Sequence, residues 1–201
     1  MTWISTIPFE QATGQLKKLY DRVVGPNSNV DNILMIHSLR PHTLQGHMAL
    51  YKNVIHNSNN QVPKSFLETL GVYVSLINRC EYCTEHHFAG LKRLLQDDQR
   101  ADKIRKSFED DDLTGSFNDK ELSALKYAKK LTFCQHLLTK KDVEEMKSLG
   151  WNDGEILEIN QVVSYFNYAN RTVSGLGVNT DGDILGLSPN DSDDEKNWSH
   201  S

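Results

Sequence analysis

Apolar residues recur every three to four positions along most of the chain, which is the spacing of amphipathic helices. Residues 9–24 show this pattern and are followed by Gly25 and Pro26, which favour a helix end. Residues 32–56 continue the pattern but are interrupted at Pro41, because proline disfavours the helical conformation for the residue before it. We therefore expect one helix in the first stretch and two in the second.

The middle of the chain carries its most apolar stretch. Pro63 suits the first position of a helix whose apolar residues run to Ile77. The run GVYVSLI (71–77) by itself would also suit a buried strand, but the total length and the lack of a partner strand favour a helix. Asparagine is a good N-cap, so we expect the chain to pause near Asn78 and to begin a new helix there.

The second half shows further helical patterns after a polar stretch. Residues 97–120 are polar and acidic, and we expect a connector there with one or two helical turns. Beyond it, capping residues mark helix starts and glycines mark helix ends. The expected segments are an amphipathic helix over 121–133, a helix after the Thr139–Asp142 capping signal that stops at Gly150, and a long apolar helix from Asn152 to Gly175 and Gly177.

The chain of 201 residues therefore reads as all-α, with six to eight helices in a single domain over residues 1–187. Residues 188–201 are polar and acidic with little to bury, so we expect them to be disordered. Within the domain we distinguish a core motif region (30–96), the connector (97–120) and a C-terminal helical half (121–187).

Charge and composition narrow the classes of partner. Charged residues make up 24% of the chain and the net charge is −5, so no basic surface points to nucleic acid or to an anionic membrane. No apolar run is long enough to span a bilayer, and the start lacks a basic region followed by an apolar segment. We expect a cytoplasmic protein whose partners are small molecules or other proteins.

The stretch NRCEYCTEHHF (78–88) holds two of the three cysteines. If Asn78 or Arg79 caps the helix, both sulfurs lie in its first turn, where free N–H groups and the helix dipole favour a thiolate. A shift of the thiol pKa from about 8.5 to about 6.5 corresponds to about 2.7 kcal/mol and would ionise most of the thiol at pH 7. His87 lies four residues after Cys83, on the same helix face, and can take its proton.

Glu68 is a further candidate because it lies in the apolar sequence FLETLGVYV. It precedes Cys80 by twelve residues, which on one unbroken helix would turn it about 120° away. It can join the cysteines only if the chain breaks between them, near Asn78. A buried glutamate needs a partner, and that partner could be His87 or a bridging water.

Three interpretations of the cysteine pair stay open from the residues alone: a redox dithiol, part of a metal site, or core packing. In a reducing compartment, catalysis or metal binding is more typical of such a pair than a structural bridge. Zinc would have Cys80, Cys83 and His87 as ligands, with Cys134 or His136 to complete the set. Otherwise we assign Cys134 to packing, and His37, His42, His47 and His56 to structure or surface.

The spacing Glu68, eleven residues, Cys80, two residues, Cys83, three residues, His87 resembles the signature of AhpD-like alkylhydroperoxidases in the carboxymuconolactone decarboxylase superfamily. The sequence VSLINRCEYCTEHH is similar to the branch of peroxidase-related enzymes, as is the segment 151–178. The resemblance extends over most of residues 5–180.

The resemblance implies an all-helical fold assembled as homotrimers or homohexamers, and thiol peroxidase chemistry without a cofactor. It implies that Cys83 is the peroxidatic thiol, that Cys80 resolves it by forming a disulfide, and that Glu68 and His87 relay protons. The reductant would be a dithiol or a lipoyl-bearing protein. Tyr82 stands where family prototypes often have histidine, so its role stays open.

Two alternatives remain beside the peroxidase. One is a decarboxylase-like lyase, which would not need the cysteine pair. The other is a protein without turnover, either a redox sensor or a zinc-binding protein. The roles of Asn167, Asn170 and Arg171 in the late helix also stay open between the site, backbone contacts and a subunit contact.

Overall fold

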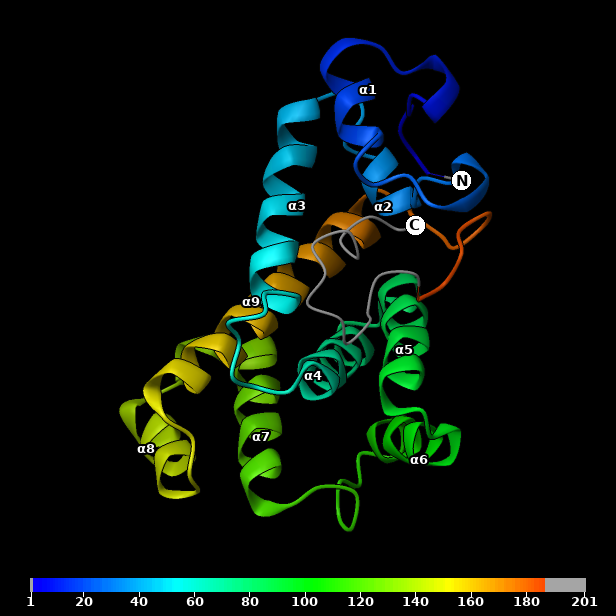
Figure 1. Cartoon of the computed structure of the whole chain (residues 1–201). Helices are drawn as coiled ribbons and strands as arrows, with labels where there is room; N and C mark the ends of the chain where they lie inside the picture. The colour runs from blue at the N-terminus through cyan, green and yellow to red at the C-terminus, as the bar shows by residue number, and fades with distance from the viewer. Residues whose placement is uncertain (1, 187–201) are drawn as a thin grey trace.

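The computed structural model describes residues 2–186, and within that range the chain is all-α, as predicted (Figure 1). It holds nine α-helices and three short 3-10 helices there, so the expected count of six to eight was too low. The disordered tail predicted for 188–201 lies outside the described residues. The α-helices are α1 (Gly14–Tyr20), α2 (Asn32–Met35), α3 (Pro41–Ile55), α4 (Lys64–Ile77), α5 (Glu81–Leu95), α6 (Asp98–Glu109), α7 (Asp119–Cys134), α8 (Lys140–Ser148) and α9 (Asp153–Gly175); the 3-10 helices are Phe9–Gln11, Pro26–Ser28 and Gln135–Leu137.

The N-terminal third follows the predicted pattern with one difference. The first helix begins only at Gly14, because Ala12 and Thr13 adopt extended backbone conformations and separate it from the turn at Phe9–Gln11. The break at Pro41 between α2 and α3 is confirmed, and Pro41 itself opens α3.

Helix α4 lies at the centre of the molecule and contacts α5, α7 and α9 (Figure 1). Its ten residues from Phe66 to Ser75 are all buried, which explains a sequence apolar enough to resemble a strand. Gly71 faces the ring of Phe166 on α9 and leaves no room for a Cβ atom, so the two helices approach closely there. Pro63 is the N-cap and not the first helical residue, so α4 begins one residue later than predicted, at Lys64.

The connector predicted for residues 97–120 contains more helix than the expected one or two turns. Residues 98–109 form α6, a helix of three turns, whose first turn is capped by the Asp97 side chain accepting a hydrogen bond from the N–H of Arg100. Ala101, Ile104 and Phe108 share one face and are buried. The many charges on the other face lowered the mean hydropathy and masked this narrow apolar stripe.

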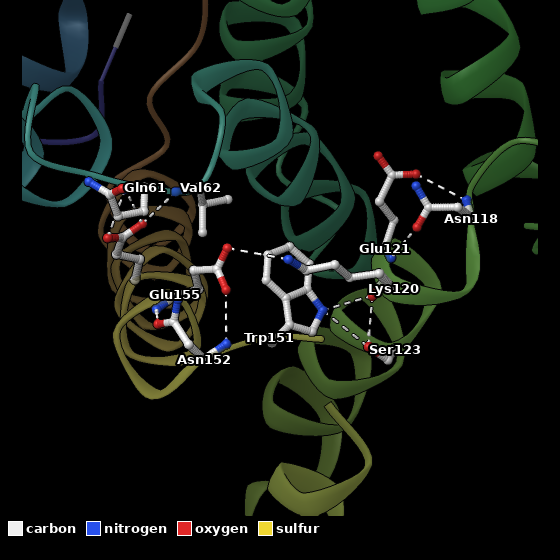
Figure 2. A network of polar contacts seen from close by, with 10 residues as sticks. Gln61, Val62, Asn118, Lys120, Glu121, Ser123, Trp151, Asn152 and Glu155 are labelled. Carbon is white, nitrogen blue, oxygen red and sulfur yellow. Dashed lines mark hydrogen bonds and ion pairs between the residues drawn. The ribbon is translucent and has the colours of Figure 1, made fainter. Parts of the chain in front are cut away.

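Capping boxes fix the helix starts in the C-terminal half. The Asn152 side chain accepts from the N–H of Glu155, whose carboxylate accepts from the N–H of Asn152, as Figure 2 shows. Asn118 and Glu121 form the same arrangement at α7. These local bonds explain why the starts of α8 and α9 were predictable from sequence.

The indole of Trp151 anchors α9 to α7. Its Nε1–H donates to the carbonyl oxygen of Lys120 at 2.8 Å and to Ser123 Oγ at 3.2 Å (Figure 2). The ring also stacks on Phe66 of α4, so one side chain joins three helices.

Among residues 2–186, no helix combines the length and the apolar character required to cross a bilayer.

Candidate active site

The corner between α4 and α5 presents the cysteine pair. Asn78 ends α4 and Arg79 adopts a left-handed conformation with φ of 55°. The N–H of Arg79 bonds to the carbonyl of Leu76 and the N–H of Cys80 to that of Ser75, which is a Schellman C-cap. Asn78 is therefore a C-cap of α4 and not the predicted N-cap of α5.

The helix break places the sulfurs as follows. Cys80 is the N-cap of α5, and Cys83 lies in its first turn. Their Sγ atoms are 2.9 Å apart, and both side chains are buried as free thiols. They lie in a small apolar cluster with Ile36 and Val173. Both thiols are thus shielded from solvent. Whether either sulfur carries a charge therefore depends on the few polar groups next to it.

The two thiols differ in acidity. The hydrogen bond from Cys83 lowers the pKa of Cys80 to about 7, against the effect of burial. Burial raises the pKa of the Cys83 thiol well above its ordinary range, and the neighbouring Cys80 raises it further. The resting negative charge therefore favours Cys80, with the Cys83 S–H donating to it.

Glu68 and His87 meet across the α4–α5 corner. Glu68 is completely buried, and its Oε2 lies 2.7 Å from His87 Nδ1. The other carboxylate oxygen, Oε1, is buried without a hydrogen-bond partner among the described residues. The edge of the His87 ring packs on Phe166, with ring centroids 4.5 Å apart. With Nδ1 engaged by the carboxylate, Nε2 is the ring nitrogen left for chemistry.

A cavity of about 50 Å³ lies beside this pair. Its wall includes Cys83 and His87 but not Cys80. Such a volume has room for a hydrogen peroxide molecule or a short organic group in place of water. A small reactant in the cavity would meet Cys83 first.

An aspartate from the C-terminal segment, Asp183, contacts two residues of the cavity wall, Tyr82 and His86. Asp183 Oδ2 accepts from the Tyr82 hydroxyl at 2.7 Å and lies 3.2 Å from His86 Nε2, while both carboxylate oxygens accept from the N–H of Asn32. Burial and the charge of Asp183 raise the pKa of Tyr82 well above its usual range. Tyr82 therefore stays a neutral phenol, which also accepts from the N–H of Ile33.

The polar residues of α9 separate into two groups. Asn170 is buried, donates to Ser75 Oγ at 3.0 Å and accepts from Asn78 Nδ2 at 2.9 Å. Its side chain also bonds to Cys83, which lowers the pKa of that thiol and partly offsets burial. Arg171 instead donates to the side chain and carbonyl of Asn167. Asn170 belongs to the site, whereas Arg171 is exposed and does not line the cavity.

Several residues of this site gave no signal in the sequence. His47 was assigned to structure or surface, but it is buried and lines the cavity with Tyr165. Asp183 lies in a segment without helical periodicity, so nothing in the sequence predicted it as a site residue. Only the spacing of a recognised motif identifies site residues in one sequence, and these three residues lie outside it.

The zinc site considered above is not assembled in the described part of the chain. No three histidine, cysteine, aspartate or glutamate side chains of residues 2–186 come together as a metal ion would require. Cys134 is a half-buried free thiol at the end of α7. His37 is buried, with Nδ1 2.9 Å from Thr43 Oγ1.

The helical arrangement is the AhpD-like fold, and it agrees with solved structures. A peroxidase-related protein from Silicibacter sp. TM1040 is 24% identical, with a TM-score of 0.77 over 89% of this chain and 91% of that chain. A peroxidase-related AhpD core protein from Ralstonia eutropha JMP134 is 18% identical, with a TM-score of 0.77 over 99% and 96%. A debrominase in complex with 2,3,4-tribromopyrrole is 14% identical, with a TM-score of 0.70 over 89% and 91%.

No family model and no curated protein matches the chain. At the identities of the solved structures the likeness is one of fold. The chain has the fold of the AhpD-like, peroxidase-related proteins, and the resemblance inferred from its motif is confirmed at that level.

Proposed function

We propose that the protein is a thiol-dependent peroxidase that reduces hydrogen peroxide or organic hydroperoxides through a Cys80–Cys83 dithiol cycle. One observation carries this proposal: two thiols 2.9 Å apart lie beside a pair formed by buried Glu68 and half-buried His87, and Cys83 and His87 share the wall of one small cavity. The fold shared with peroxidase-related proteins supports it.

The reaction balances as follows. The Cys83 thiolate attacks the terminal oxygen of the hydroperoxide, so an S–O bond forms and the O–O bond breaks. The leaving oxygen takes the electron pair and receives a proton from Nε2 of His87, which takes up one proton from solvent in each cycle while Nδ1 donates to Glu68. Cys80 then condenses with the sulfenic acid, releasing water and forming a disulfide. An external dithiol reduces the disulfide and regenerates both thiols.

The position of the cavity, and not the resting charge, assigns the roles of the two sulfurs. At rest the charge lies on Cys80, which does not line the cavity. Transfer of the Cys83 proton across the 2.9 Å contact moves the charge to the sulfur that a peroxide can reach. Cys83 is accordingly the peroxidatic thiol and Cys80 the resolving one.

The partners follow from the same proposal. The electron donor is a dithiol, such as a lipoyl-bearing protein, because a disulfide must be reduced in each cycle. A reducing cytoplasm would keep both cysteines in the free form needed for attack. The homotrimer or homohexamer expected from the sequence stays a prediction, which the mass of the particle in solution would test.

Steady-state consumption of peroxide with a dithiol reductant tests the proposal. Cys83→Ser should abolish turnover, and Cys80→Ser should leave a sulfenic acid at Cys83 that mass spectrometry detects after trapping. Cys134→Ser is the matched control and should retain turnover. Turnover that survives in Cys83→Ser would refute the proposed cycle, and a single oxidation without turnover would identify a redox sensor.

The relay is tested by Glu68→Gln, which keeps the shape of the side chain and removes its charge. Loss of general acid–base catalysis should lower the rate about 10²–10⁴-fold. Glu158→Gln is the control, because within residues 2–186 Glu158 accepts hydrogen bonds from the backbone N–H groups of Gln61 and Val62 and does not line the cavity. Equal rates in both variants would exclude Glu68 from the relay.

A lyase would behave differently, since decarboxylation of a lactone acid would survive substitution of both cysteines. The debrominase among the fold neighbours adds bromopyrroles to the substrates worth testing. Debromination that depends on Cys83, with no turnover of peroxide, would reassign the dithiol to that reaction.

A further inference from the structure

His47 of α3 and Tyr165 of α9 form a polar pair on the cavity wall that the peroxidase mechanism above does not use. Their side chains are 4% and 3% exposed, yet each carries polar atoms. The Tyr165 hydroxyl lies 3.4 Å from His47 Nε2, which is long for a hydrogen bond. His47 Nδ1 is buried without a hydrogen-bond partner among the described residues.

An unsatisfied buried nitrogen needs an explanation, because leaving such a group unpaired costs about 1–3 kcal/mol. Here the residue that carries it lines the same cavity as Cys83 and His87. Aromatic rings hold the imidazole in place, with Tyr51 stacked at 6.5 Å between centroids and His37 at 5.1 Å. The imidazole of His47 is therefore already fixed on the cavity wall before a reactant binds.

Both groups are neutral hydrogen-bonding groups. Burial lowers the pKa of His47 to about 3, with a further contribution from His37, so its ring carries one N–H and one lone pair. Burial raises the pKa of Tyr165 well above its usual range, and the nearby Tyr51 and Cys83 raise it further. Tyr165 therefore keeps its O–H.

Whichever way the bond between them runs, one donor of the pair stays available. If Tyr165 donates to Nε2, the hydrogen of His47 is on Nδ1 and can donate to a ligand. If Nε2–H donates to Tyr165, the phenol O–H can donate to the ligand and Nδ1 can accept from it. In both arrangements Nδ1 has no hydrogen-bond partner among the described residues and is left to bind a ligand.

We propose that the His47–Tyr165 pair binds the hydroperoxide and holds its leaving oxygen with the one donor that stays available, while Cys83 attacks the terminal oxygen. The inference rests on the proposed peroxidase function and adds a binding site to it. The pair transfers no proton, since His87 protonates the leaving oxygen. It stabilises the charge that develops as the O–O bond breaks, in the manner of an oxyanion hole.

The experiment measures the rate constant for oxidation of the reduced protein by ethyl hydroperoxide, whose organic group is short. His47→Phe should lower it about tenfold or more, because loss of one such donor costs enzymes up to about 10²–10³-fold. Tyr165→Phe should lower it too. His47→Asn, whose amide can reach the position of Nδ1, should retain more activity than His47→Gln, whose amide reaches that of Nε2.

Two controls separate binding from structure. His42→Phe replaces an exposed histidine of the same helix that does not line the cavity, and it should leave the rate unchanged. The ratio of rates between the unsubstituted protein and His47→Phe should be constant from pH 6 to 8, because neither member of the pair titrates there. A ratio that follows the thiolate titration would mean that the substitution acts on the cysteines, which overturns the inference.

Failure of the inference is distinct from failure of the proposed function. If the unsubstituted protein reacts with the hydroperoxide and His47→Phe reacts equally fast, the binding role is refuted and the peroxidase stands. The same holds if His47→Asn and His47→Gln are equally active. If the unsubstituted protein does not react at all, both proposals fall.

Discussion

Replacing Cys83 with alanine tests the origin of the low pKa of Cys80. The hydrogen bond from Cys83 is the largest cause of that lowering, and burial opposes it. With the donor removed and the sulfur still enclosed, the pKa of Cys80 should return from about 7 at least to its ordinary value of 9.0.

The expected magnitude follows directly. A difference of two pH units corresponds to about 2.7 kcal/mol between the two protonation states. At pH 7 about half of Cys80 is thiolate in the unsubstituted protein, whereas about 1% would be thiolate in Cys83→Ala. The free energy of unfolding of the reduced protein should also differ. Between pH 7 and 9 the unfolded chain binds more protons than native Cys80 does, so stability rises with pH there and the variant loses this rise.

The assay is the ultraviolet absorbance of the thiolate as a function of pH, with the variant lacking both cysteines as the baseline. Cys134→Ala is the matched control and should leave the transition near pH 7. An unchanged transition in Cys83→Ala would show that the hydrogen bond between the sulfurs is not the cause, and the assignment of the resting charge would then be wrong.

Three further substitutions test the surroundings of the site. Gly71→Ala would force a Cβ against Phe166, and the free energy of unfolding in urea should fall by about 1–3 kcal/mol. Gly46→Ala, at an exposed position of α3 with open space for a Cβ, should instead raise the free energy of unfolding by about 0.5–1 kcal/mol. Similar effects of the two would contradict the close packing of α4 on α9. Asn170→Ala should raise the pKa of the dithiol in the same absorbance titration, since it removes a hydrogen bond to sulfur, and an unaltered titration would exclude this contact. Asp183→Ala should lower the free energy of unfolding by about 1–3 kcal/mol, because Asn32, Tyr82 and His86 lose a shared partner and the first two are buried. Hydrogen exchange should show faster opening at α2.

The predictable parts of the site were those fixed by local rules. The four-residue step from Cys83 to His87 puts both on one face of any helix, and the helix was evident from its periodicity. The break near Asn78 was also correctly located, although the sequence could not tell a C-cap from an N-cap there. Asparagine suits either role, and the left-handed conformation of Arg79 decided between them.

The contact between Glu68 and His87 was expected only if the chain turned back between α4 and α5. Its geometry is present, with 2.7 Å between carboxylate and imidazole, because the Schellman turn reverses α5 against α4. The prediction for residues 97–120 was wrong because it saw only composition. The narrow apolar stripe of α6 is outweighed by many charges, and only the surface on which the stripe packs shows that it forms a helix.

The sequence by itself determined the helical class, the capped starts of α8 and α9, and the motif of paired cysteines with its histidine. These depend on periodicity and on hydrogen bonds that span only a few residues. The tertiary structure alone decided which sulfur carries the charge, and it brought His47 and Tyr165 to the cavity and Asp183 to Tyr82 and His86 of its wall. Acidity and binding depend on burial and on neighbours from other helices, and no stretch of sequence specifies those before the chain is folded.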